Sequence, residues 1–181
     1  MKTPEYEIKR ATVRDKRELV ACFQTLSKAA VRARYQGEEH PDPFTLDEFI
    51  AFVRSNFHDI HLLRILEPHK QLAGWGEFYP YGENQASLSL LIHPSFQGRG
   101  LGFELAQHLI REARRKLDTC FITWGIDESQ DPNSSSHRLI RKLGRAHLHL
   151  NRIPILDTQI IEYILQVSHF QNSLPLESLA A

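Results

Sequence analysis

The sequence predicts a mixed α/β fold in a single domain. Short apolar runs bounded by Gly, Pro or Asn, which are typical of strands, alternate with longer segments whose apolar residues recur at helical spacing. The chain has 181 residues, of which 41% are hydrophobic and 24% charged. This length and composition suit one globular domain with a buried core, and they exclude a disordered or a disulfide-stapled chain.

The first half of the chain is expected to form two helices within a series of strands. Asp15 is a suitable N-cap for the first helix, and Thr45 with Glu48 forms a capping box at the start of the second. Pro41 and Pro43 place a loop between the two helices. The expected elements, in order, are a strand at 6–9, a helix at 15–30, a loop at 31–44, a helix at 45–56 and strands at 60–66, 72–79 and 86–93.

The second half opens with the clearest helix of the chain, at 101–117. One stripe of this segment is apolar, as expected for a helix packed on a sheet: Leu105, Ala106, Leu109, Ile110, Ala113 and Leu117. A later helix is expected to run from the turn at 131–134 to about Leu143, with Gly144 ending it. The remaining expected strands lie at 120–124, 146–150 and 159–167.

Charge, cysteine content and hydropathy exclude several classes of protein. The 22 Lys and Arg balance the 22 Asp and Glu, which argues against nucleic acid or an anionic membrane as the main partner. Cys22 and Cys120 are far apart and are expected to be reduced thiols. No signal peptide or membrane span is recognisable, so we expect a soluble, cytoplasmic protein. Residues 1–167 are expected to form the domain, and 168–181 a docking arm or a disordered tail.

The segment 97–102 carries the strongest chemical signal. It follows an apolar strand, contains Gly98, Gly100 and Gly102, and opens the long helix. Glycines allow several backbone N–H groups to converge, and the helix N-terminus adds further N–H groups and a positive dipole, so the segment predicts a phosphate-binding loop. The dinucleotide motif G-x-G-x-x-G fails here, because Phe103 stands at its third glycine. The nucleoside-triphosphate loop fails because the chain has no Gly-Lys pair.

This segment resembles the signature Q/R-x-x-G-x-G/A of the GCN5-related N-acetyltransferases (GNAT). The matching residues are Gln97, Gly98, Arg99, Gly100, Leu101 and Gly102, and they are preceded by Ile92-His93-Pro94, which is similar to the family's V-x-P. Two further segments also resemble the family: residues 8–15, and the spacing of Asn133, Ser136, Leu139, Lys142 and Gly144. The resemblance extends over about 6–167.

The resemblance implies an acyl-CoA N-acyltransferase fold, a mixed, mostly antiparallel sheet of about seven strands flanked by about four helices. It also implies acetyl-CoA as co-substrate, with its pyrophosphate on the loop 97–102, to which Arg99 could add a charge-assisted contact. The pantetheine arm would pair with the backbone of Leu90, Leu91 and Ile92. Asn133 would contact the same arm or cap the helix that follows it. An amine acceptor would then attack the thioester directly.

Glu77 is the favoured general base, because an ammonium acceptor must lose a proton before it attacks. It shares one strand face with Trp75 and Tyr79. Glu83 and Glu128 are weaker candidates for the base. The simpler interpretation of Glu77 is a solvated strand residue with no catalytic role. The tyrosine that commonly protonates the leaving thiolate in the family falls at Ile140. Substitutes for it could be Tyr79, Tyr81 or Ser134.

The sequence therefore leaves two functions open. The favoured one is an enzyme, an N-acetyltransferase acting on an amine of a small molecule or peptide, and the other is a non-catalytic acyl-CoA-binding sensor of the same fold. A nucleic-acid-binding role for the basic flank 111–116 is disfavoured by the neutral net charge. No metal is expected, because the pairs His58/His61 and His147/His149 lack a third ligand. The apolar last strand and the tail are compatible with a homodimer.

Overall fold

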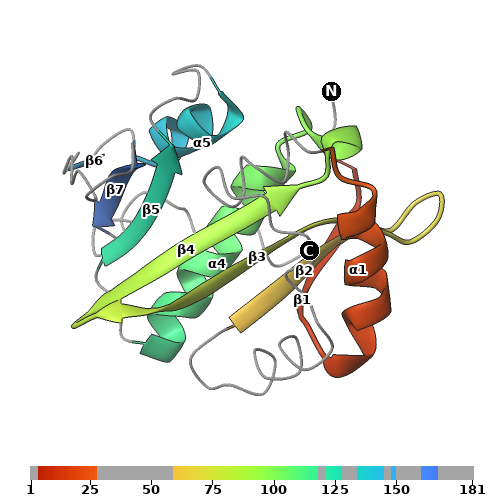
Figure 1. Cartoon of the computed structure of the whole chain (residues 1–181), viewed down its shortest axis with the longest axis horizontal. Helices are drawn as coiled ribbons and strands as arrows, with labels where there is room; N and C mark the ends of the chain where they lie inside the picture. Colours follow the sequence, from red (N-terminus) through yellow and green to blue (C-terminus); the bar gives the residue numbers. More distant parts are fainter. Residues whose placement is uncertain are drawn as a thin grey trace, which may run out of the picture.

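The computed structural model describes residues 4–27, 59–117, 121–127, 134–144, 148–149 and 160–166. Their strands form one seven-stranded sheet in the order β1-β2-β3-β4-β5-β7-β6, antiparallel at every pairing except β4 with β5. Helix α4 lies against one face of the sheet and α1 against the other (Figure 1). The predicted mixed, mostly antiparallel sheet is therefore confirmed.

The N-terminal elements follow the predicted order. They are β1 (Tyr6–Arg10), the 3-10 turn η1 (Val13–Asp15), α1 (Lys16–Gln24), β2 (Asp59–Ile65), β3 (Gln71–Gly82) and β4 (Gln85–Ile92). The helix predicted at 45–56 and its capping box lie outside the described residues.

The predicted start of α1 is confirmed, because Asp15 occupies its N-cap position, but the predicted end was wrong. Asp15 makes no side-chain cap bond to α1; instead it forms a capping box with Thr12, whose N–H it accepts at 2.7 Å, so a 3-10 turn precedes the helix. The helix ends at Gln24 rather than Ala30, because Thr25 turns back and its hydroxyl donates to the carbonyl of Cys22 at 2.6 Å.

The C-terminal elements also match the predicted types. They are the 3-10 turn η2 (Pro94–Phe96), α4 (Leu101–Leu117), β5 (Phe121–Asp127), α5 (Ser135–Leu143), β6 (Leu148–His149) and β7 (Ile160–Gln166). The N-cap of α5 is Ser134, whose hydroxyl accepts the N–H of His137 at 3.4 Å, and Gly144 occupies its C-cap. None of the described helices combines the length and apolar character needed to cross a membrane.

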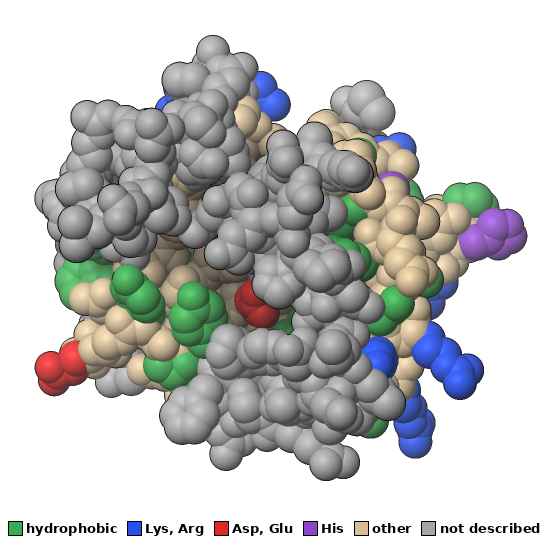
Figure 2. Space-filling model, viewed as in Figure 1, with side chains coloured by type: hydrophobic (Ala, Val, Ile, Leu, Met, Phe, Trp, Pro, Cys, Tyr) green, Lys and Arg blue, Asp and Glu red, His purple; other side chains and the backbone are tan. Residues whose placement is uncertain are grey.

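Two hydrophobic layers hold the sheet between its helices. The predicted stripe of α4 is buried against β3 and β4, and Leu105, Ala106 and Leu109 have no exposed surface. On the other face, Leu19 and Phe23 of α1 pack with Trp75 of β3. Figure 2 shows this second face, where hydrophobic side chains gather over the β3–β4 hairpin and basic ones over α1.

A pair of histidines, the buried His61 and the half-buried His108, joins β2 to α4. The rings of His61 and His108 are linked by a hydrogen bond of 2.9 Å between Nδ1 and Nε2, and His61 stacks on Phe78. The pKa of His61 is lowered to about 4, chiefly by burial and next by the neighbouring His108. Asp59 and Glu112 oppose this shift, and Lys116 adds to it. The folded protein therefore favours a neutral His61.

We expect this pair to make the protein acid-sensitive between pH 6.5 and 4.5. The pKa of His61 is lower in the folded chain than in the unfolded one, so its contribution to stability is complete above pH 6.5 and falls as the pH approaches 4. The expected loss of unfolding free energy between pH 7 and 4.5 is about 2–3 kcal/mol, measurable by urea denaturation. The H61Q variant should lose clearly less unfolding free energy over this pH range. The control H69Q, at an exposed histidine, should lose as much as the wild type. Equal losses in the wild type and H61Q would contradict the assignment.

Candidate functional site

The sheet opens between β4 and β5. These two strands pair only over Gln85–Ser87 and Phe121–Thr123, although β4 continues to pair with β3 as far as Ile92. Beyond Ser87, residues 88–92 therefore have no neighbouring strand on the β5 side, within the part of the chain that the structure describes. The strands diverge visibly from this point (Figure 1).

Backbone groups of β4 point into this opening. The carbonyls of Ser89 and Leu91 lie against Gly76 and Gly74 of β3, so the odd-numbered residues face β3. Alternation along a strand turns the intervening residues the other way. The carbonyl of Ala86, an even-numbered residue, accordingly faces β5 and accepts a hydrogen bond from the side-chain hydroxyl of Thr123 at 3.5 Å. The N–H and C=O groups of Leu88 and Leu90 are thus presented to the gap, where an extended ligand could pair with them.

The glycine loop closes one end of the opening. Gly98 and Gly100 have φ angles of 75° and 83°, a left-handed region that residues with a side chain rarely adopt. No atom lies within 4 Å of the position that a Cβ would take at either glycine. Among the described residues, no backbone carbonyl accepts from the N–H groups of 98–102. The loop and the first turn of α4 therefore form an open set of donors suited to an anion.

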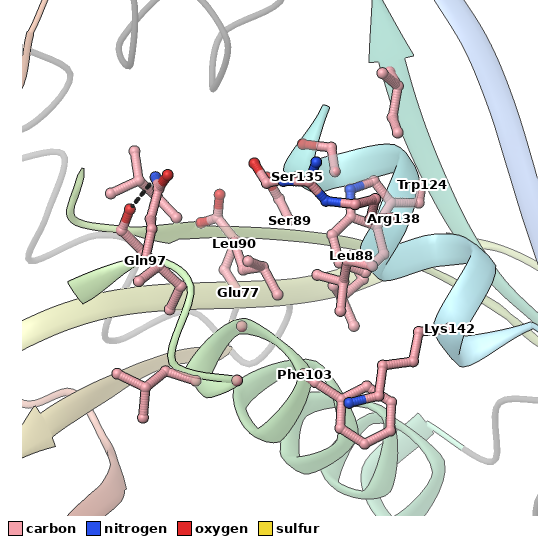
Figure 3. Close-up of a pocket in the computed structure, with 18 of the residues that line it drawn as sticks. Glu77, Leu88, Ser89, Leu90, Gln97, Phe103, Trp124, Ser135, Arg138 and Lys142 are labelled. Atoms are coloured by element: carbon pink, nitrogen blue, oxygen red, sulfur yellow. Dashed lines mark hydrogen bonds between the residues drawn. The ribbon is translucent and has the colours of Figure 1, made fainter. Parts of the chain in front are cut away.

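Gln97 and Arg99 have different positions in this loop. Gln97 lines the cavity, and its side-chain amide donates to the carbonyl of Ile92 at 2.9 Å, which holds the loop against the end of β4 (Figure 3). The guanidinium of Arg99 lies over the ring of Phe96 and donates to the carbonyl of Ser95 at 3.1 Å. Arg99 is not among the residues that line the cavity, so its contact with phosphate stays a prediction.

A cavity of about 590 Å³ connects the loop, the strand opening and α5 (Figure 3). Its polar lining comes from three regions: the loop 97–102, the strand face with Glu77 and Ser89, and α5 with Ser135, Arg138 and Lys142. Apolar residues complete it, namely Leu88, Leu90, Leu91, Ile92, Phe96, Leu101, Phe103, Trp124, Ile126 and Leu139. The predicted Leu91, Ile92, Gln97, Gly98, Gly100, Leu101 and Gly102 all lie on this one surface.

Glu77 lies on the cavity wall, directly across from Ser89 in the β3–β4 pairing. Tyr79 and Ser87 form the next pair on the same face, because side chains alternate along strands. The same face of β3 carries Trp75, which is buried under α1. The arrangement places one carboxylate and three hydroxyls at the floor of the opening.

The candidate general acids differ in their access to the cavity. Ile140, which occupies the position of the family's tyrosine, is buried in the core and cannot donate a proton. Tyr81 is exposed and does not line the cavity, and Ser134 is engaged with the backbone and ring of His137. Tyr79 does line the cavity, and it is the only phenol to do so among the described residues.

Several expected residues lie outside the described part of the chain: Asn133, Glu128, His58 and His147. Among the described residues, no group of three or more His, Cys, Asp or Glu is arranged to hold a metal ion. Arg138 was not among the predicted site residues, although it stands four residues before Lys142 and three after Ser135, a spacing that places all three on one helix face.

A sheet that opens between two parallel strands, with a glycine loop at the start of the following helix, is typical of the acyl-CoA N-acyltransferase fold. The family model described as the acetyltransferase (GNAT) family matches residues 23–144. The chain belongs to this family, and the predicted resemblance is confirmed. No curated protein matches the chain in sequence.

Solved structures share the fold at low sequence identity. The GNAT domain of S. lividans PAT is 14% identical with a TM-score of 0.73, over 89% of this chain and 90% of that one. Spermidine N-acetyltransferase from Vibrio cholerae, solved with CoA and spermine, is 13% identical with a TM-score of 0.69, over 92% and 98%. An N-acetyltransferase from Staphylococcus aureus Mu50 is 24% identical with a TM-score of 0.64, over 90% and 99%.

Proposed function

We propose that this protein transfers an acetyl group from acetyl-CoA to an amine of a small molecule or peptide. The observation that carries the proposal is the single cavity surface shared by the N–H groups of 98–102 and the open backbone of β4. The first would hold the pyrophosphate, and the second would pair with the amides of the pantetheine arm. The Vibrio cholerae relative, solved with CoA and spermine, supports an acyl-CoA donor and an amine acceptor.

In this proposal, catalysis combines the positioning of two substrates with the transfer of protons. Glu77 accepts a proton from the ammonium acceptor, directly or through a water. The amine nitrogen then attacks the thioester carbon, a C–N bond forms, and the C–S bond breaks as the tetrahedral intermediate collapses. The departing thiolate takes one proton from the nitrogen, through Tyr79 or water, and leaves as the free thiol, while the amide product keeps the other N–H.

The second candidate function is a non-catalytic acyl-CoA sensor. The observation that favours it is the buried Ile140 at the position of the family's usual acid. A CoA thiolate needs little help to leave, so this substitution alone does not remove activity. Both functions require CoA binding, and only the enzyme releases free thiol when an amine is present.

We expect acetyl-CoA to stabilise the protein selectively against heat. A ligand at 100 times its Kd adds about 2.7 kcal/mol to the unfolding free energy, which corresponds to a rise in Tm of roughly 5–10 °C for a domain of this size. NAD and ATP, whose binding motifs the loop lacks, should leave Tm unchanged. The absence of a shift with any CoA species would refute both functions. Stabilisation without thiol release across a panel of amines would favour the sensor.

A further inference from the structure

His93 stands at the end of β4, between this strand and the glycine loop 97–102. Its N–H donates to the carbonyl of Ala73 on β3 at 2.9 Å, which extends the pairing of the two strands by one residue. The next three residues form the turn η2, and Gln97 begins the loop directly after them. The orientation of η2 therefore determines where the loop starts. His93 itself is half-buried and does not line the cavity.

The side chain of His93 makes hydrogen bonds with two different elements. Its Nδ1 accepts the N–H of Ser95 at 3.3 Å, so the ring caps the start of η2. Its Nε2 lies 3.2 Å from the hydroxyl oxygen of Thr25, the residue that follows the last turn of α1. Because α1 and α4 cover opposite faces of the sheet, the ring joins the end of α1 to the loop at the start of α4 (Figure 1).

The partners of the two ring nitrogens determine the tautomer of His93. The hydroxyl of Thr25 donates its proton to the carbonyl of Cys22 at 2.6 Å, so the hydroxyl oxygen accepts from the ring. Nε2 must then carry the ring proton, and the unprotonated Nδ1 can accept from Ser95. Both bonds require the same neutral tautomer, so the ring forms them at the same time.

The turn that His93 caps carries two residues of the site. Phe96 lines the cavity, and the guanidinium of Arg99 lies 5.4 Å from the centre of its ring. Gln97 also lines the cavity and donates to the carbonyl of Ile92 at 2.9 Å (Figure 3). A change in the orientation of η2 would displace these residues together with the first N–H groups of the loop. An anion bound to the loop and the ring of His93 therefore favour the same conformation of the turn.

We propose that His93 is a positioning residue that couples the loop 97–102 to the end of α1. This inference rests on the proposed use of acetyl-CoA, whose pyrophosphate would order the loop. By thermodynamic linkage, a ligand that favours the bonded arrangement of His93 also stabilises the last turn of α1, and breaking either bond weakens the binding of that ligand. The N–H groups of Thr25 and Leu26 donate within this last turn, so their exchange rates measure its stability.

Two substitutions separate the bonds of the ring. H93A removes both, whereas the side-chain oxygen introduced by H93N stands at the position of Nδ1 and can still accept from Ser95. By calorimetry, we expect the Kd of acetyl-CoA to rise about tenfold in H93A and about threefold in H93N. H69N, at the exposed histidine between β2 and β3, is the matched control and should bind as the wild type.

Amide hydrogen exchange followed by NMR supplies a measurement that a merely structural role of His93 would not change. Saturating acetyl-CoA should slow exchange at Thr25 and Leu26 by about threefold in the wild type and in H69N, the same factor that H93N loses in affinity. Exchange at these two amides should not respond to acetyl-CoA in H93A or H93N. T25V, which removes the partner of the ring, should also lose the response, whereas T25S should keep it. The ¹⁵N chemical shifts of the His93 ring at pH 8 should show the Nε2–H tautomer.

Several outcomes would overturn the coupling and leave the proposed function intact. One is a wild-type Kd in H93A. Another is exchange at Thr25 and Leu26 that does not respond to acetyl-CoA in the wild type, or that responds equally in H93N. An Nδ1–H tautomer would also overturn it, since that ring could not accept from Ser95. Failure of the wild type to bind acetyl-CoA would instead reject the proposed function, and the coupling with it.

Discussion

Replacing Gly100 by alanine should lower the affinity for acetyl-CoA by about 100-fold or more. The added Cβ meets no atom, but the φ angle of 83° becomes costly, by roughly 1–2 kcal/mol, for a residue with a side chain. The loop would relax away from this conformation, and the N–H groups of 98–102 would no longer converge on one anion. Hydrogen bonds to charged groups are worth about 1.5–3 kcal/mol each, so losing two of them accounts for the expected fall.

The matched control for this variant is G82A. Gly82 has a φ angle of 141°, lies at the end of β3 in the β3–β4 hairpin and does not line the cavity. Its replacement therefore introduces backbone strain without touching the loop, and we expect an unchanged Kd for acetyl-CoA. Calorimetry on the two variants and the wild type measures the effect. If G100A binds as tightly as G82A, the loop does not hold the pyrophosphate.

The second large effect is expected at the proposed base. Replacing Glu77 by glutamine keeps the shape of the side chain but removes its ability to accept a proton. General base catalysis contributes about 10²–10⁴-fold, so kcat/KM for the amine should fall by at least 100-fold while the Kd of acetyl-CoA stays the same. The deficit should narrow as the pH rises, because solvent then deprotonates more of the acceptor.

The control for E77Q is E83Q. Glu83 lies in the exposed turn between β3 and β4, outside the cavity lining, and was the nearest alternative base in the sequence. We expect it to retain wild-type kcat/KM across the pH range. Wild-type activity in E77Q, or an equal loss in both variants, would remove Glu77 from the mechanism.

The local elements were predictable because their signals are local. The apolar stripe of 101–117 specified a helix whose limits the structure reproduces, and the spacing of Gly98 and Gly100 specified a loop whose two positive φ angles the structure contains. The start of α1 was also predictable from Asp15, which occupies its N-cap position. The sequence analysis did not anticipate that the Asp15 side chain forms a capping box with Thr12 in the 3-10 turn before the helix.

The remaining features of the site depend on how distant segments meet. The opening exists because β5 leaves β4 after Thr123, and no residue in either strand signals that divergence by itself. Arg99 was expected near phosphate because of its place in the motif; its side chain contacts Phe96 and Ser95 and does not line the cavity, so this expectation stays a prediction. The spacing of Arg138 from Ser135 and Lys142 places it on one helix face with them, but Arg138 becomes part of the site only because α5 packs beside Gly102.

Amide hydrogen exchange followed by NMR, with and without acetyl-CoA, tests the proposed binding site most directly. In the free protein the N–H groups of Leu88, Leu90 and 98–102 lack backbone partners among the described residues, so they should exchange quickly. We expect saturating acetyl-CoA to slow exchange in both segments together, since one ligand would pair with the strand edge and fill the loop. Binding that protects other amides and leaves these two segments unchanged would contradict the proposed site.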